Sequence, residues 1–194
     1  MSTLSAISIL PASPEDAPTL ARVHGDAFQD SPLNDLMFGP PTEENLKGFE
    51  GHLAELIASD KAARFAKAVD NDTNKIVGWT WWNFFPDRES RLQGSEAFAK
   101  EHDAAPESAL SPEAYKEYFQ GVAARQEKWI AGRPVAFLRV LVVLPEYQRK
   151  GIEAGYDLYK KLGFKDLNDS IVINLAKYGE SGITTTALNR FESI

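Results

Sequence analysis

The sequence contains no cysteine and only three histidines. The absence of cysteine excludes disulfides, thiolate metal sites and cysteine nucleophiles, and it suits a reducing compartment. His24, His52 and His102 are far apart in the sequence and form no metal-binding motif, so we expect no metal. The longest apolar run, 135–144, is interrupted by Arg139 and is much shorter than the roughly 20 residues of a membrane helix. We therefore expect no membrane span.

Positive charge is also scarce, because 21 lysines and arginines face 28 acidic residues, for a net charge of −7. This balance argues against a nucleic acid or an anionic membrane as partner. The N-terminus lacks the basic and apolar regions of a secretory signal, so we expect a soluble protein of the cytoplasm or the nucleus. Sequence patterns typical of serine hydrolases, P-loop nucleotide hydrolases and dinucleotide-binding enzymes are missing too.

The length of 194 residues and the apolar content of 43% favour a single domain spanning 1–194. Near its start, Ser13, Pro14 and Asp16 form a helix start signal with a capping-box acid. A helix with one apolar face should follow, and apolar residues at helical spacing predict a second helix over 43–58.

The hydrophobic period then changes from that of a helix to that of strands. Two strands, 64–69 and 76–85, flank a polar turn and predict an antiparallel hairpin. The second strand is rich in aromatic residues, including Trp79 and Trp81. One face of this strand could line a substrate pocket, but packing in the hydrophobic core is the favoured interpretation.

Residues 86–132 are more charged and should form a helical insertion between the hairpin and the next strand. A strong helix begins at Pro112, and its apolar stripe is more typical of core packing than of a ligand site. The apolar segment 135–144 has the pattern of a central strand covered on both faces. A short helix over about 154–162 and a last strand over 170–175 would complete a crossover unit, so we predict an α/β fold with a mixed α+β sheet.

A basic, glycine-containing turn follows the apolar strand directly and is the best candidate for a binding site. A pyrophosphate needs several backbone N–H groups aimed at one point. Gly151 would permit a close approach of the backbone, and Arg149 and Lys150 would add positive charge. An ordinary basic turn after a buried strand is the alternative interpretation of the same residues.

Residues 141–152, which read LVVLPEYQRKGI, resemble the acetyl-CoA signature of the GCN5-related N-acetyltransferases (GNAT superfamily). Residues 155–164, GYDLYKKLGF, resemble a second segment of that family, in which a tyrosine serves the departing CoA thiolate. By this match the tyrosine is Tyr159, although its position alone is more typical of a half-buried tyrosine on a short helix. The resemblance implies that acetyl-CoA, as co-substrate, is held by Leu141, Val142, Val143, Gln148, Arg149, Lys150, Gly151 and Ile152.

The family chemistry implies direct attack of an amine on the thioester carbonyl of acetyl-CoA. A backbone N–H near Leu141 or Val142 would meet the developing negative charge, and Tyr159 would protonate the leaving sulfur. Glu146 and Asp157 are possible general bases, and water could relay the proton instead. The acceptor could be a small-molecule amine or the amine of a peptide, and the oligomeric state is left open.

The sequence departs from the family pattern after Ile152. Gly151 and Gly163 are only 12 positions apart, as if roughly 25 to 30 residues, one helix and one strand, were missing. The remaining helix could then follow the turn directly, or the apolar strand could be left with an exposed edge. We hypothesise that coding sequence was skipped at this point. The alternative function is a catalytically inactive acetyltransferase-like protein, or a truncated isoform, with a binding role or none.

Overall fold

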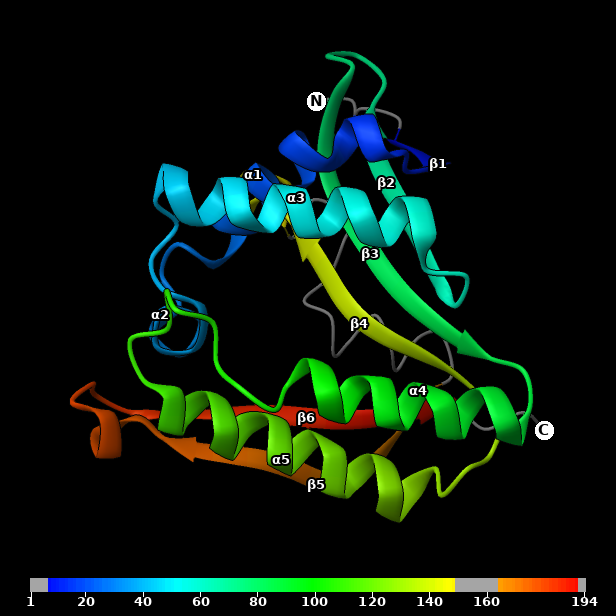
Figure 1. The fold of residues 1–194 in the computed structure, drawn as a ribbon. Helices are drawn as coiled ribbons and strands as arrows, with labels where there is room; N and C mark the ends of the chain where they lie inside the picture. The colour runs from blue at the N-terminus through cyan, green and yellow to red at the C-terminus, as the bar shows by residue number, and fades with distance from the viewer. Residues whose placement is uncertain (1–6, 149–163, 192–194) are drawn as a thin grey trace.

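The computed structural model describes residues 7–148 and 164–191, and it contains two antiparallel sheets flanked by helices (Figure 1). The first sheet has the strand order β1-β2-β3-β4, and the second pairs β5 with β6. The strands are β1 (Ile7–Pro11), β2 (Ala63–Asp70), β3 (Lys75–Phe85), β4 (Val135–Val143), β5 (Phe164–Asn174) and β6 (Ile183–Phe191). The α-helices are α1 (Ala17–Phe28), α2 (Pro32–Phe38), α3 (Glu43–Ser59), α4 (Arg88–Glu101) and α5 (Pro112–Trp129).

The N-terminal start signal folds as its sequence predicts. The backbone N–H of Ser13 donates to the Asp16 carboxylate over 2.8 Å, and Pro14 opens a short 3₁₀ turn, η1 (Pro14–Asp16), that leads into α1. The Lys67 ammonium on β2 reaches the same carboxylate at 2.7 Å. The cap therefore also fastens the start of α1 to the first sheet.

One hydrophobic core lies between α1, α3 and the first sheet, on the face that these two helices cover in Figure 1. Trp79 is only 2% exposed, and its indole Nε1 donates to the Leu20 carbonyl over 2.9 Å. Trp81 lies farther along the same face of β3 and is also buried. These two side chains confirm core packing as the role of the inward-facing tryptophans.

A second core lies between α2, α5 and β5, in the lower layer of Figure 1. Ile173 of β5 and Ala114 of α5 are almost completely buried there. Outside this core, Asp169 of β5 binds Arg125 at 2.9 Å and Lys128 at 2.7 Å. Since both cations belong to α5, the ion pairs fix that helix to the second sheet.

Two sequence predictions need correction. The segment 135–144 is a strand, but among the described residues β4 ends the first sheet and pairs with β3 alone, so it is not central. The last predicted strand, 170–175, is β5 and begins earlier; it pairs with the unpredicted β6 rather than completing a crossover with β4. Helix α2 was not predicted either, because its single short apolar face is interrupted by polar residues.

The predicted hairpin and the helices starting near 43 and 112 are present. The predicted helix over 154–162 lies outside the described residues. None of the described helices has the length and apolar character needed to cross a membrane.

Candidate functional site

The end of β4 and the turn after it form the part of the predicted cofactor site that the structure describes. The backbone N–H of Leu144 donates to the Val77 carbonyl over 2.9 Å and therefore points toward β3. The Val143 carbonyl instead accepts from the Gln148 side chain at 2.9 Å. Because successive residues of a strand point their backbone groups to opposite edges, Val143 and Leu141 address the edge away from β3. No described strand pairs with that edge.

The turn that carries Gln148 is fastened to the β2–β3 hairpin through a buried carboxylate. Asp70, at the end of β2, is 3% exposed and accepts from the Tyr147 hydroxyl over 2.7 Å. It also accepts from the backbone N–H groups of Asp72 and Thr73 at 2.9 and 3.2 Å. The hydrogen bond to Asp70 raises the pKa of Tyr147, which therefore stays protonated as a donor. The 3₁₀ turn η2 (Pro145–Tyr147) is thus held in a fixed position beside the end of β4.

A β-bulge interrupts the pairing of β3 with β4 two residues before Leu141. Trp81 pairs with Val140 and Trp82 pairs with Leu138, so Arg139 is the extra residue on β4. A bulge re-aims the side chain that it displaces and is common beside functional sites. Here the Arg139 guanidinium lies over the Trp81 ring, 4.5 Å from its centroid.

Arg139 is also held by α4. Its guanidinium lies 5.0 Å from the centroid of Phe98, and its Nη2 bonds the Glu101 carboxylate at 3.1 Å. Next to this pair, the His102 ring stacks on Phe98, and Nδ1 lies 2.8 Å from the Phe98 carbonyl. Desolvation by burial lowers the pKa of His102, which favours the neutral ring. A charged and aromatic surface therefore faces the bulge from α4.

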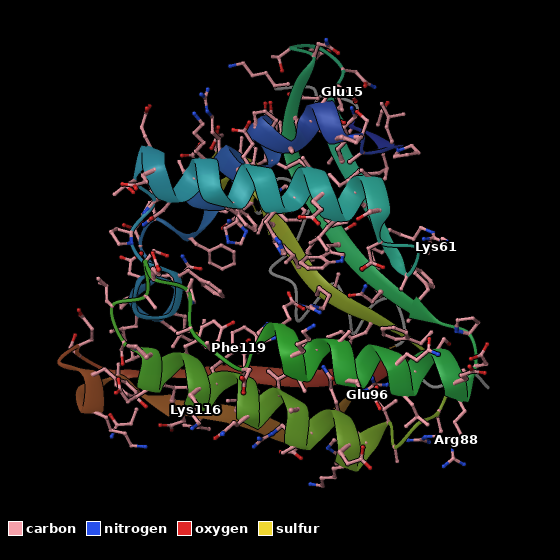
Figure 2. All side chains as sticks on the ribbon, viewed as in Figure 1. Glu15, Lys61, Arg88, Glu96, Lys116 and Phe119 are labelled. Atoms are coloured by element: carbon pink, nitrogen blue, oxygen red, sulfur yellow. The ribbon has the colours of Figure 1, made fainter. Side chains whose placement is uncertain are left out.

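Aromatic rings of α5 close this surface from below. Phe119, labelled in Figure 2, has its ring centroid 3.8 Å from that of His102 and 6.1 Å from that of Phe98. Tyr115 packs on Phe119 at 4.5 Å, and burial raises the pKa of Tyr115 to about 12. These contacts leave the rings closely packed, so they form a rigid wall rather than an open cage.

The structure brings together only part of the predicted site. Leu141, Val142 and Val143 lie in consecutive positions at the end of β4, and Gln148 follows η2. Arg149, Lys150, Gly151, Ile152 and the proposed acid Tyr159 lie outside the described residues. Of the two candidate bases, Glu146 is exposed on η2, and Asp157 also lies outside the described residues.

Sequence reasoning missed the group around Arg139. The one available signal was a cation in an otherwise apolar strand, which marks a buried or partly buried charge that needs partners. Its partners Trp81 and Glu101 could not be identified, because they come from segments distant in sequence. Among residues 7–148 and 164–191, no cluster of histidines and carboxylates suited to a metal ion is present.

Comparison with known proteins finds neither a matching family model nor a matching curated protein. Solved structures do match. A mosquito arylalkylamine N-acetyltransferase-like protein, 5b, is 15% identical with a TM-score of 0.51, over 83% of this chain and 76% of that one. The polyamine N-acetyltransferase of Drosophila melanogaster, which forms N-acetylagmatine, is 13% identical with a TM-score of 0.50, over 84% of this chain and 77% of that one. At such identities the likeness concerns the fold, and it confirms the fold that the sequence resemblance predicted.

Proposed function

We propose that this chain, which has the fold of the GCN5-related N-acetyltransferases, is an N-acetyltransferase that moves an acetyl group from acetyl-CoA to an amine. The observation that carries the proposal is the end of β4. There the backbone of Leu141 and Val143 addresses the edge away from β3, and Gln148 binds that same edge. A thioester lying along this edge would find backbone N–H donors next to a turn of predicted anion-binding character.

Each group in the proposed site has its own role in the acetyl transfer. The Leu141 N–H donates to the thioester oxygen as negative charge develops on it, a stabilisation that is large in a site shielded from water. The turn 148–152 holds the pyrophosphate through its backbone N–H groups and the cations of Arg149 and Lys150. Tyr159 gives its proton to the departing thiolate when the carbon–sulfur bond breaks. The amine nitrogen forms the new bond to the acetyl carbon and loses its proton to water or to a carboxylate such as that of Glu146.

The fixed position of η2, which precedes the proposed pyrophosphate turn, supports these roles. Tyr147 and Asp70 hold η2 against the first sheet, so the residues after it start from a defined point. Pre-organised donors lower the free energy of the transition state because they need not be reoriented during reaction. The acceptor would approach the end of β4 along its edge away from β3, where no described strand pairs.

Calorimetric titration with acetyl-CoA tests the proposal. Two proteins are compared: the chain as it stands, and a version with a family-length insertion of about 25 to 30 residues after Ile152. Micromolar binding by the chain as it stands, together with release of thiol when an amine is added, supports the transferase. The Tyr159→Phe variant should keep its affinity for acetyl-CoA and lose most of its turnover.

Binding by the lengthened protein alone would overturn the proposal for this sequence. It would favour the second candidate, a catalytically inactive acetyltransferase-like protein, for which the short separation of Gly151 and Gly163 is the specific argument. Absence of binding in both proteins would exclude acetyl-CoA as the substrate of this site.

A further inference from the structure

Arg91 of α4 is a buried cation with no anionic partner among residues 7–148 and 164–191. The residue is 3% exposed, and its guanidinium donates to the Ser95 hydroxyl at 2.6 Å and to the Gln126 amide oxygen at 3.1 Å. Both acceptors are neutral, and Nε has no partner. Arg91 forms no ion pair with any residue that the structure describes, and the nearby Glu127 is exposed. A buried unpaired charge costs several kcal/mol, so an anion at this position would be strongly favoured.

A small cavity of about 10 Å³ adjoins Arg91, between the end of β3, the start of β4 and helices α4 and α5. Asn83, only 5% exposed, lines it, and its Oδ1 has no hydrogen-bond partner. Arg139 brings a second guanidinium to the lining. The remaining wall is largely apolar and includes Phe85, Phe98 and Phe137.

The cavity is just large enough for one oxygen atom, since about 10 to 15 Å³ is the smallest cavity volume that holds a water molecule. A water could accept from Arg91 and donate to Asn83, yet it would leave the positive charge of Arg91 uncompensated. A carboxylate with one oxygen in the cavity supplies the missing negative charge. A half-turn of the Asn83 amide would then present an N–H donor to that oxygen.

The cavity lies close to the proposed site of acetyl transfer. Arg139 precedes Leu141 by two residues, about 7 Å along the strand. Arg139 lines the cavity and lies over the ring of Trp81, at the bulge that precedes Leu141. Asn83 pairs with Phe137, which precedes Leu141 by four residues. An acceptor whose amine reaches Leu141 could therefore place a group about 10 to 14 Å away in the cavity.

We propose that the cavity formed by Arg91, Asn83 and Arg139 binds a carboxylate group. In addition, and resting on the acetyltransferase function proposed above, we infer that this carboxylate belongs to the acceptor amine. The acceptor class would then be an amino acid with its amine several bonds from its carboxylate. The same cavity could also bind a free carboxylate ion, so the carboxylate of the acceptor and a free ion need separate tests.

The first test measures binding of acetate ion without acetyl-CoA. Sodium acetate at about 100 mM should raise the melting temperature by about 3 °C over sodium chloride of equal ionic strength, because it binds only the folded chain. The Arg91→Met variant should lose this difference. Arg88→Met is the matched control, since Arg88 lies on the same helix and is exposed (Figure 2), and it should keep the difference. Equal melting temperatures in both salts would overturn the carboxylate site.

A second variant covers the case in which Arg91→Met does not fold. Asn83→Asp places a carboxylate in the cavity with almost no change of shape. It should raise the melting temperature in chloride and remove the response to acetate, because the site then carries its own anion. A lower melting temperature, or an unchanged response to acetate, would contradict the proposal.

The third test identifies the source of the carboxylate. The rate constant kcat/KM is compared for ω-amino acids of increasing length, from ε-aminohexanoate to 10-aminodecanoate, and for the amino alcohols of equal length. One carboxylate should favour the amino acids about tenfold, the gain typical of a charge-assisted hydrogen bond, and Arg91→Met should abolish that preference. A response to acetate without such a preference would assign the cavity to a free anion and overturn the acceptor class. If acetyl-CoA does not bind at all while acetate still does, the transferase function fails and the carboxylate site stands.

Discussion

Tyr147 and Asp70 are 77 positions apart in the sequence and are joined by a 2.7 Å hydrogen bond. Through this bond the turn after β4 is fixed to the end of β2, on the far side of β3. A buried carboxylate that accepts from a tyrosine and from two backbone N–H groups is well satisfied. The position of the candidate pyrophosphate turn therefore depends on a strand that contributes nothing else to the proposed site.

Replacing Tyr147 by phenylalanine tests this relationship. The variant should be about 1 to 3 kcal/mol less stable, because a hydrogen bond to a charged buried group is lost. Its affinity for acetyl-CoA should also fall, which calorimetric titration would measure. Tyr178→Phe is a suitable control: Tyr178 also donates to a carboxylate, that of Glu117, but lies in the lower layer. The control should be destabilised and should keep its affinity for acetyl-CoA. Full stability of Tyr147→Phe would contradict the anchoring role.

His24 should make the protein sensitive to mild acid. Burial among Phe28, Phe49 and Trp79 lowers the pKa of His24 to about 4. In the unfolded chain the pKa is near 6.5, so below that pH the unfolded state binds a proton that the folded state does not. Stability should be complete above pH 6.5 and should fall by about 3 kcal/mol as the pH decreases to 4.

Urea unfolding at several pH values measures this dependence. His24→Leu should remove most of the decrease between pH 6.5 and 4. The control is His52→Leu, at an exposed position of α3, and it should retain the decrease. A wild-type chain whose stability is constant over this range would rule out a neutral buried His24.

Asp169 should set a second acid transition at lower pH. Hydrogen bonds from Lys128 and Trp129, together with one from Arg125, lower its pKa to about 2. Since the folded pKa lies below the unfolded one, the stabilisation is present above about pH 4 and is lost as the pH falls toward 2.

The Asp169→Asn variant should therefore be less stable at neutral pH and should show a weaker dependence on pH below 4. Asp26→Asn, at an exposed position of α1, serves as its control and should match the wild type in both respects. Thermal unfolding followed by circular dichroism at pH 7, 4 and 2.5 would distinguish the two variants.

Two glycines in helices should respond in opposite directions to alanine. A Cβ on Gly94 of α4 would overlap the ring of Phe85, so Gly94→Ala should cost about 1 to 3 kcal/mol. A Cβ on Gly48 of α3 would meet no atom within 4 Å. Gly48→Ala should therefore stabilise the chain by about 0.5 to 1 kcal/mol through helix propensity. Denaturant unfolding compares the two. A neutral Gly94→Ala would mean that Phe85 can leave its position against α4 without cost.

The sequence by itself determined the elements whose signals are local. Ser13, Pro14 and Asp16 fixed the start of the first helix, because a cap acts over three residues. The strands around the turn 70–74 followed from their period and from the turn residues, and the hairpin needs no distant partner. The resemblance over 141–152 also identified the fold, since a short motif with a strand, a proline and a glycine turn is a local pattern.

Only the tertiary structure decided where these elements lie relative to one another. The pattern of β4 is apolar on both faces, which indicates burial but does not say whether neighbouring strands or helices provide it. For that reason its place at the end of the described sheet was mispredicted. The pairing of β5 with β6 likewise depends on contacts between strands, which an isolated period of two does not specify.

The candidate site also combines residues predicted from the sequence with residues that only the structure brought to light. Leu141 to Val143 and Gln148 were predicted from the motif, whereas no sequence pattern singled out Arg91, which the fold buries against Gln126. Burial is a property of what packs on a residue, and for Arg91 those neighbours come from three separate segments of the chain. Sequence thus determined which groups are available for chemistry, and the packing of α4 and α5 on the sheet left Arg91 without an anionic partner among the described residues.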